Sequence, residues 1–179
     1  MLRERKLNRK DEIYREITES DQETADLGSR LAKKIEEVFL DGESSRGIVV
    51  MLKGELGAGK TCLVRGAAGH LFPSRHVTSP SYTIMNEYAG ADIHLVHADL
   101  YRIESEEEIE YTGLYAQPED NTILMIEWPG LVRDEWQDYI LIEIEKRGDL
   151  SRLITLWAAG EVETSILKEL KRSYESFRN

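Results

Sequence analysis

The chain has 179 residues, 41% of them hydrophobic, which suffices for one domain with a buried core. Its formal net charge of -11 argues against a protein that grips nucleic acid by itself, because such binding depends on Lys and Arg neutralising phosphates. The single cysteine, Cys62, excludes an internal disulfide framework, and no run of eighteen apolar residues occurs, so we expect a cytoplasmic protein that spans no membrane.

The predicted elements alternate between amphipathic helices and short apolar strands. Residues 1–19 are highly charged and fit either a frayed helix or a short strand with a tail. Ser20 and Glu23 match a helix-capping box, and apolar residues then recur at helical spacing, which predicts a helix over 21–40. The further predictions, in chain order, are a buried strand (48–52), a helix (60–71), two strands (82–88 and 93–97), an acidic helix (104–111), a second buried strand (123–126), two strands (139–145 and 153–157) and a last helix (163–177). Helices that alternate with buried strands predict an α/β sandwich around a mainly parallel sheet.

The segment G-E-L-G-A-G-K-T at residues 54–61 matches the pattern G-x-x-x-x-G-K-[ST] in full. Its glycines let the backbone approach phosphate oxygens, and the N–H groups of the loop and of the next helix form a cage of partial positive charge. Lys60 would reach the β- and γ-phosphates, and the Thr61 hydroxyl would ligate Mg²⁺. A chance match in a chain of this length has a probability of about one percent or less. The segment therefore predicts a phosphate loop for ATP or GTP.

Two carboxylates are candidates for the rest of the site. Glu127 ends a buried apolar strand, where a P-loop protein places its second magnesium residue, although an exposed strand end gives the same pattern. Asp99 closes another predicted strand and could orient or deprotonate the attacking water, or cap the helix that follows. Trp128 could cover the nucleotide or pack beside Pro129.

The four histidines do not predict a metal site. His94 and His97 are three residues apart on a predicted strand, so their side chains point to opposite faces. His70 and His76 are expected in a loop.

Four motifs in order make the chain similar to a known family. GELGAGKT (54–61), TSPSYTIMNEY (78–88), HADLYRI (97–103) and IEWP (126–129) resemble the TsaE family, formerly YjeE. These bacterial ATPases are required for threonylcarbamoyladenosine modification of tRNA at position 37. The resemblance, from about Ser20 to Leu156, implies a single P-loop NTPase-like domain over 1–179, a three-layer sandwich whose mainly parallel central sheet carries antiparallel strands. Residues 1–19, a charged N-terminal extension, and residues 161–179, a C-terminal helix, lie outside the shared core.

The resemblance also implies the roles of individual residues. ATP would be bound by Thr24, Gly57, Ala58, Gly59, Lys60, Thr61, Cys62, Trp128 and Arg152. Thr61 and Glu127 would hold Mg²⁺, while Asp99 and Lys60 would act in hydrolysis.

Two features of the family pattern concern other positions. Ser79, Pro80 and Tyr82 fall in a segment that behaves like a switch loop. Ser81 and Cys62 stand where threonines are common in the family; Ser81 keeps the hydroxyl, and Cys62 leaves the phosphate-binding backbone available.

The family implies a complex with the TsaB and TsaD proteins, in which ATP hydrolysis keeps the pair turning over and tRNA is met only indirectly. The acidic charge fits this arrangement, and we expect the acidic segment 104–110 to dock on a basic partner surface.

Three other functions remain open at this point. A small-molecule kinase usually brings an arginine-bearing lid over the phosphoryl group, whereas the segment after Arg102 is acidic and would repel a phosphate. A GTPase is disfavoured because no N-K-x-D stretch occurs. A nucleotide-dependent scaffold with incidental hydrolysis stays possible because the role of Asp99 is an inference.

Overall fold

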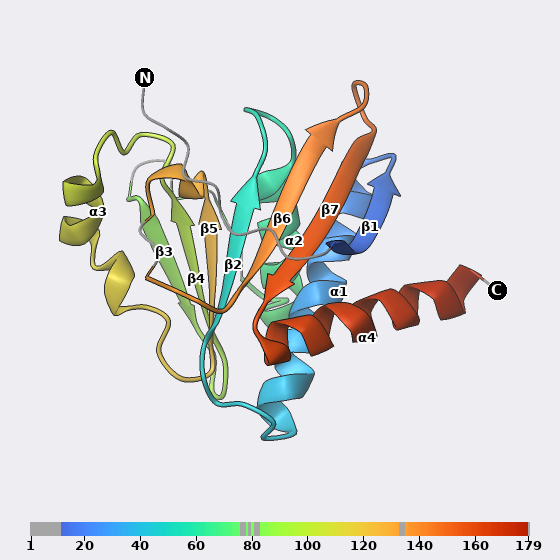
Figure 1. Ribbon diagram of the computed structural model, residues 1–179, viewed down its shortest axis with the longest axis horizontal. Helices are drawn as coiled ribbons and strands as arrows, with labels where there is room; N and C mark the ends of the chain where they lie inside the picture. The colour runs from blue at the N-terminus through green and yellow to red at the C-terminus, as the bar shows by residue number, and fades with distance from the viewer. Residues whose placement is uncertain (1–11, 76–77, 79, 81–82, 133–134, 179) are drawn as a thin grey trace.

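The computed structural model describes residues 12–75, 78, 80, 83–132 and 135–178, and within them seven strands form one mixed sheet (Figure 1). The strand order across the sheet is β1-β7-β6-β2-β5-β4-β3. The strands are β1 (Glu12–Thr18), β2 (Ile48–Lys53), β3 (Met85–Ala89), β4 (His94–Asp99), β5 (Thr122–Glu127), β6 (Tyr139–Lys146) and β7 (Arg152–Ala159). The helices are α1 (Asp21–Leu40), α2 (Lys60–Leu71), α3 (Glu106–Thr112) and α4 (Glu161–Arg178), with short 3₁₀ turns at Leu114–Ala116 and Pro129–Leu131.

The centre of the sheet is parallel and its edges are antiparallel. Strands β4, β5, β2 and β6 run parallel to one another, whereas β3 pairs with β4, β7 with β6 and β1 with β7 in antiparallel fashion. All six residues of β5 are buried, as are the first five of β2, which explains why both read as continuous apolar runs in the sequence. The predicted α/β sheet, mainly parallel at its centre with added antiparallel strands, is confirmed.

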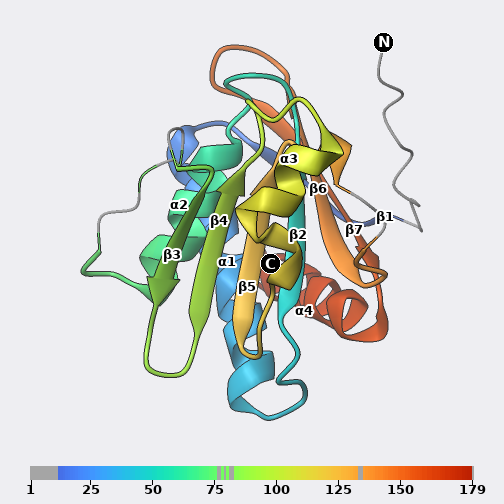
Figure 2. The ribbon, with the colours of Figure 1, turned by 90° about the vertical axis from the view of Figure 1, so that its left-hand side faces the viewer.

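Helices cover both faces of the sheet and make three layers (Figures 1 and 2). One face carries α1, α2 and α4, and the other carries α3. Alternate residues of β2 divide between two apolar cores, Val50 and Leu52 on the α1–α2 side and Val49 and Met51 on the α3 side. Helices α1 and α2 approach so closely that a Cβ at Gly28 would clash with the backbone carbonyl of Leu63. This packing fixes the start of α2 relative to the sheet.

Some predicted boundaries shift. Strand β3 begins at Met85 rather than residue 82, directly after Ile84, whose φ of 66° is incompatible with a strand; residues 81 and 82 lie outside the described part. Helix α3 begins at Glu106 because the Ser105 side chain caps it by accepting from the Glu108 N–H. Residues Glu12–Thr18 form a strand, the second of the two alternatives for the N-terminal segment.

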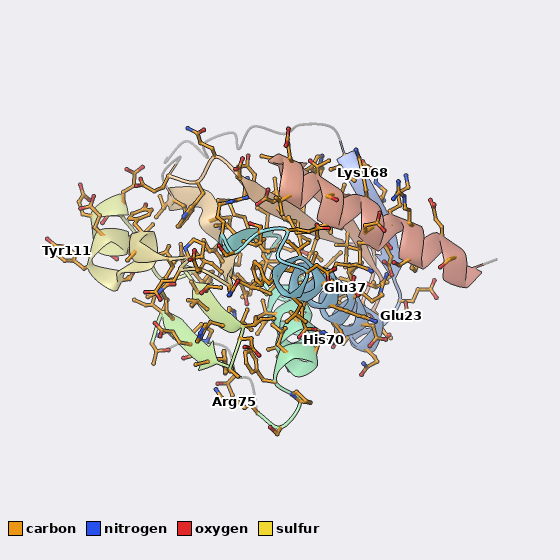
Figure 3. The ribbon with its side chains drawn as sticks, turned by 90° about the horizontal axis from the view of Figure 1, so that it is seen from below. Glu23, Glu37, His70, Arg75, Tyr111 and Lys168 are labelled. Atoms are coloured by element: carbon orange, nitrogen blue, oxygen red, sulfur yellow. The ribbon has the colours of Figure 1, made fainter. Side chains whose placement is uncertain are left out.

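The loop expected around His70 is wrong. His70 lies in the last turn of α2, and its Nε2 is 2.7 Å from a carboxylate oxygen of Glu36 on α1 (Figure 3). The helix predicted over 60–71 already contained this position, and that prediction agrees with the bounds of α2. His76 lies outside the described residues. In the portion of the chain that the structure describes, no helix has the length and apolarity needed to cross a membrane.

Candidate functional site

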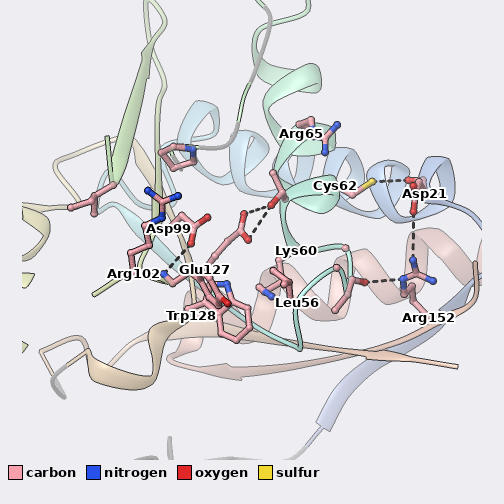
Figure 4. Close-up of a pocket in the computed structure, with 17 residues that line it drawn as sticks. Asp21, Leu56, Lys60, Cys62, Arg65, Asp99, Arg102, Glu127, Trp128 and Arg152 are labelled. Atoms are coloured by element: carbon pink, nitrogen blue, oxygen red, sulfur yellow. Dashed lines mark hydrogen bonds and ion pairs between the residues drawn. The ribbon is translucent and has the colours of Figure 1, made fainter. Parts of the chain in front are cut away.

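A cavity of about 480 Å³ lies where β2, β4 and β5 end and α2 begins (Figure 4). The carboxyl ends of parallel strands meet at this edge, which is where α/β folds place their ligands. Although the chain carries a net charge of -11, the cavity is lined by four basic side chains and three acidic ones. The basic residues are Lys60, Arg65, Arg102 and Arg152, and the acidic ones are Asp21, Asp99 and Glu127. The charged side chains of the lining therefore sum to +1, four basic less three acidic, in a chain of net charge -11, and this balance suits an anionic ligand.

The phosphate loop, residues 54–61, connects β2 to α2 along one side of the cavity. Gly57 and Gly59 have φ values of 73° and 114°, which residues other than glycine rarely adopt. Gly59 is the N-cap of α2 and provides no capping side chain. The N–H groups of the first turn of α2 are thus available for oxygen atoms of a ligand, as at other anion-binding helix termini.

Lys60 is buried at the start of α2, only 4% exposed. Its Nζ donates to the carbonyl oxygens of Gly54 (2.7 Å) and Glu55 (3.0 Å) and lies 3.8 Å from the centre of the Trp128 ring. Burial lowers the pKa of this ammonium, and the nearby carboxylates of Glu127 and Asp99 oppose that effect. A phosphate at the loop would place negative charge next to the Lys60 ammonium and so compensate for the hydration that burial removes.

Trp128 has an unusual backbone for a bulky residue, with φ 60° and ψ 53°. Its N–H donates to the Leu52 carbonyl at 3.2 Å, which joins the ends of β5 and β2. The ring lines the cavity, lies 5.0 Å from the Tyr101 ring and faces the Lys60 ammonium. Trp128 therefore contributes a wall of the cavity, and its strained backbone aims the ring there.

Glu127 ends β5 in the floor of the cavity and is 2% exposed. The Thr61 hydroxyl donates to its carboxylate, 2.8 Å from Oε1 and 3.1 Å from Oε2, and Nε2 of His97 lies 2.9 Å from Oε1. A hydroxyl and a carboxylate are the hard oxygen ligands that Mg²⁺ prefers. Among the described residues no group of three or more His, Cys, Asp or Glu could hold a metal alone. The oxygens of Thr61 and Glu127 fit Mg²⁺, which commonly takes only one or two protein ligands and its other ligands from water and phosphate.

Asp99 ends β4 directly beside Glu127, since the two residues are partners in the β4–β5 ladder. It lines the cavity, and its Oδ1 accepts a hydrogen bond from the Tyr101 N–H at 3.1 Å. It does not cap a helix, because α3 begins only at Glu106. The structure therefore places the Asp99 carboxylate at the cavity beside Glu127, and its role as a catalytic base stays a prediction.

Arg152 and Thr24, both predicted to contact the nucleotide, support the phosphate loop. The buried Arg152 side chain lines the cavity, but its Nε donates to the Ala58 carbonyl at 2.9 Å. Thr24 does not line the cavity; its Oγ1 lies 2.8 Å from Oγ1 of Thr18 and donates to the Ser20 carbonyl. Its methyl group lies behind Gly59, 3.5 Å from where a Cβ would stand.

The remaining predicted residues that the structure describes lie at the cavity. Gly57, Ala58, Gly59 and Cys62 all line the cavity. The Cys62 thiol donates to the Asp21 carbonyl at 2.9 Å, and burial raises its pKa. Pro80 lines the cavity as well, while Ser79 and Tyr82 lie outside the described residues.

Sequence reasoning missed several residues at the cavity. Arg65 was detectable, because it follows Thr61 by four residues on α2 and so shares its helix face. Tyr101 and Arg102 belong to the motif that begins at His97 and also reach the cavity. The contact of His97 with Glu127 was not foreseen, because it depends on which strands are neighbours. The acidic segment 104–110 does not line the cavity.

The fold and the glycine loop at the end of β2 define an α/β protein of the P-loop NTPase-like class. Comparison with known proteins then gives its family. The model of the family described as threonylcarbamoyl adenosine biosynthesis protein TsaE matches residues 18–154, and the chain belongs to this family.

Relatives and a solved structure agree with this assignment. The tRNA threonylcarbamoyladenosine biosynthesis protein TsaE of Bacillus subtilis is 37% identical over 127 residues, which cover 70% of this chain and 79% of the relative. The protein of the same name from Treponema pallidum is 34% identical over 141 residues, 78% of this chain and 97% of the relative. The crystal structure of Bacillus subtilis YdiB superposes with a TM-score of 0.68 at 28% identity and covers 89% of this chain and 95% of its own.

Proposed function

We propose that this protein binds and hydrolyses ATP with Mg²⁺ as a subunit of the tRNA threonylcarbamoyladenosine machinery. The observation that carries the proposal is the meeting of Lys60, Thr61 and Glu127 at one cavity, beside a complete phosphate-loop motif. Membership of a family whose relatives are named for this biosynthesis supplies the pathway.

The residues of the cavity have separate tasks in this proposal. Lys60 leaves the Gly54 and Glu55 carbonyls and binds the β- and γ-phosphates, which then satisfy its buried charge. Thr61 and Glu127 hold Mg²⁺, which neutralises charge on the phosphates when it is bound. Asp99 orients the attacking water and accepts its proton.

The partners in the proposal are the TsaB and TsaD proteins. The acidic segment 104–110 lies on α3 and its approach, on the outer face of the sheet, where Tyr111 is 91% exposed and points away from the body (Figure 3). This segment takes no part in the cavity, and its five glutamates carry the negative charge that would complement a basic partner surface. Reversing charges there should weaken assembly and flatten its salt dependence; unchanged assembly and salt dependence would refute this surface.

The test is ATP hydrolysis by the protein alone and with the TsaB–TsaD pair added. We expect strong stimulation by the pair and its loss in Lys60→Ala. Equal and negligible rates with and without the pair would refute the partner-gated mechanism.

A small-molecule kinase is the second candidate, because Arg65 and Arg102 line the cavity. The acidic segment 104–110, which we expected to repel a phosphate, does not line the cavity, so it gives no argument against a kinase. Phosphoryl transfer from ATP to any compound of a metabolite panel, faster than hydrolysis, would favour the kinase. A scaffold role is favoured instead if Asp99→Ala keeps both nucleotide affinity and full tRNA modification.

A further inference from the structure

His97 occupies a position beneath the cavity that neither the phosphate loop nor the proposed hydrolysis accounts for. It lies on β4 two residues before Asp99, so both side chains project from the same face of the sheet. It is fully buried. The register pairs His97 with Met125 and Asp99 with Glu127, so the imidazole reaches diagonally along the neighbouring strand to Glu127.

The polar contacts of the ring are one-sided. Its Nε2 lies 2.9 Å from Oε1 of Glu127. An ionised carboxylate only accepts hydrogen bonds, so Nε2 carries the hydrogen of this contact. The other nitrogen, Nδ1, is buried and has no hydrogen-bond partner among the residues that the structure describes. A histidine that served packing alone would be expected to satisfy both nitrogens or to be replaced by an apolar residue.

The carboxylate of Glu127 is consequently held from two sides. His97 fixes Oε1 from the buried side, and the Thr61 hydroxyl contacts both oxygens from the loop side. Thr61 is itself a predicted ligand of Mg²⁺ and must turn its oxygen toward the cation when one binds. The contact with His97 is then the one that continues to orient the carboxylate.

We propose that His97 is a positioning residue that orients the Glu127 carboxylate for the cation and thereby sets the affinity for Mg²⁺ in the nucleotide complex. This inference rests on the proposed function, because it takes Mg²⁺ at Thr61 and Glu127 as given. Groups that orient a metal ligand in this way change metal affinity by about 10- to 100-fold when removed.

The test compares His97→Leu, which removes the donor, with His97→Gln, whose side-chain amide keeps an N–H group. ATP binding is measured at equilibrium in EDTA and then across a Mg²⁺ titration, and Mn²⁺ binding in the presence of ADP is followed by electron paramagnetic resonance. His97→Leu should need about 10- to 100-fold more Mg²⁺ for half-maximal enhancement of ATP binding. Its affinity for ATP in EDTA should stay at the wild-type value, and His97→Gln should recover most of the loss.

Two further variants separate positioning from folding. His94→Leu, an exposed position at the start of the same strand, should leave the Mg²⁺ titration unchanged. In a Glu127→Gln background, where the metal ligand is gone, His97→Leu should cause no further change in Mg²⁺ dependence. A merely structural role would instead lower thermal stability and ATP binding in EDTA in both backgrounds.

The outcomes also distinguish this inference from the proposed function. Absence of any Mg²⁺ effect on ATP binding in the wild type would overturn both. A normal Mg²⁺ effect in the wild type that persists unchanged in His97→Leu would overturn the role of His97 alone and leave the proposed function intact.

Discussion

The two walls of the cavity are built from different halves of the sheet and hold their residues by different means. On the β6–β7 side, Arg152 lines the cavity and Lys146 does not, but both donate to carbonyls of the phosphate loop, Arg152 to Ala58 and Lys146 to Leu56; this loop-holding wall acts on backbone shape. On the β4–β5 side, Asp99 and Glu127 form a carboxylate wall at the ends of parallel strands. Under the proposed function, this difference assigns the affinity for phosphate and the chemistry performed on it to separate structural elements.

The largest expected effect separates the chemistry from the affinity. Asp99→Asn should lower partner-stimulated ATP turnover by about 10²- to 10⁴-fold, the usual contribution of a positioned base, while ATP affinity stays near the wild-type value. Turnover is measured at saturating ATP and affinity by equilibrium titration. As a matched control, Asp21→Asn removes a carboxylate of the same cavity that lies on α1 and should have a much smaller effect. Equal losses of ATP turnover in Asp99→Asn and Asp21→Asn would show that the carboxylate wall has no special role in the chemistry.

Lys60→Ala should weaken ATP binding by about ten- to a hundredfold, because a charge-assisted hydrogen bond contributes about 1.5–3 kcal/mol. Lys60 lies between the two walls, so this change should abolish stimulated hydrolysis too. Calorimetric titration with ATP and Mg²⁺ measures the loss. Unchanged affinity would contradict the assigned contact with phosphate.

Arg152→Leu tests the loop-holding wall. The substitution leaves the Ala58 carbonyl without its donor, which should cost about 1–3 kcal/mol in the free energy of unfolding. ATP affinity should fall with it while turnover at saturating ATP changes little. Arg172→Leu is the control, since this arginine is exposed on α4. Loss of turnover at saturating ATP without loss of ATP affinity would show that Arg152 acts in hydrolysis and not in holding the loop.

A smaller change is expected at Lys146, the exposed member of the same wall. Lys146→Ala should change ATP affinity and stability by less than about 1 kcal/mol, because exposed ion pairs and hydrogen bonds contribute little. Thermal unfolding with and without ATP measures both quantities. A loss as large as that of Arg152→Leu would show that burial is not what distinguishes the two residues.

Cys62 gives the smallest effect and a pH dependence. Burial raises the pKa of its thiol, so the thiolate fraction at neutral pH is lower than in an ordinary cysteine. Alkylation by iodoacetamide should therefore be slow, and its rate should still increase above about pH 8.5, where an unperturbed thiol is half ionised. A rate that levels off below that pH would contradict the raised pKa.

The sequence predicted the carboxylate wall and the phosphate loop because each depends on local pattern. A strand ending in a carboxylate, as at Glu127 and Asp99, and a glycine loop between strand and helix are visible within a few residues. The loop-holding wall was not predictable in the same way, because the donor–acceptor contact of Arg152 with Ala58 joins residues 94 positions apart. His97 illustrates the same limit. Its separation from His94 excluded a ligand pair, but only the order of strands brings it to Glu127.

The central claim is that the cavity binds the phosphates of ATP together with Mg²⁺. A crystal structure determined with a non-hydrolysable ATP analogue and Mg²⁺ tests it most directly. We predict β- and γ-phosphates against the N–H groups of residues 57–61, the Lys60 ammonium moved from the Gly54 carbonyl to a phosphate oxygen, and the cation between Thr61 and Glu127. Nucleotide bound elsewhere, or phosphates at the loop with Lys60 still on the Gly54 carbonyl, would contradict the account.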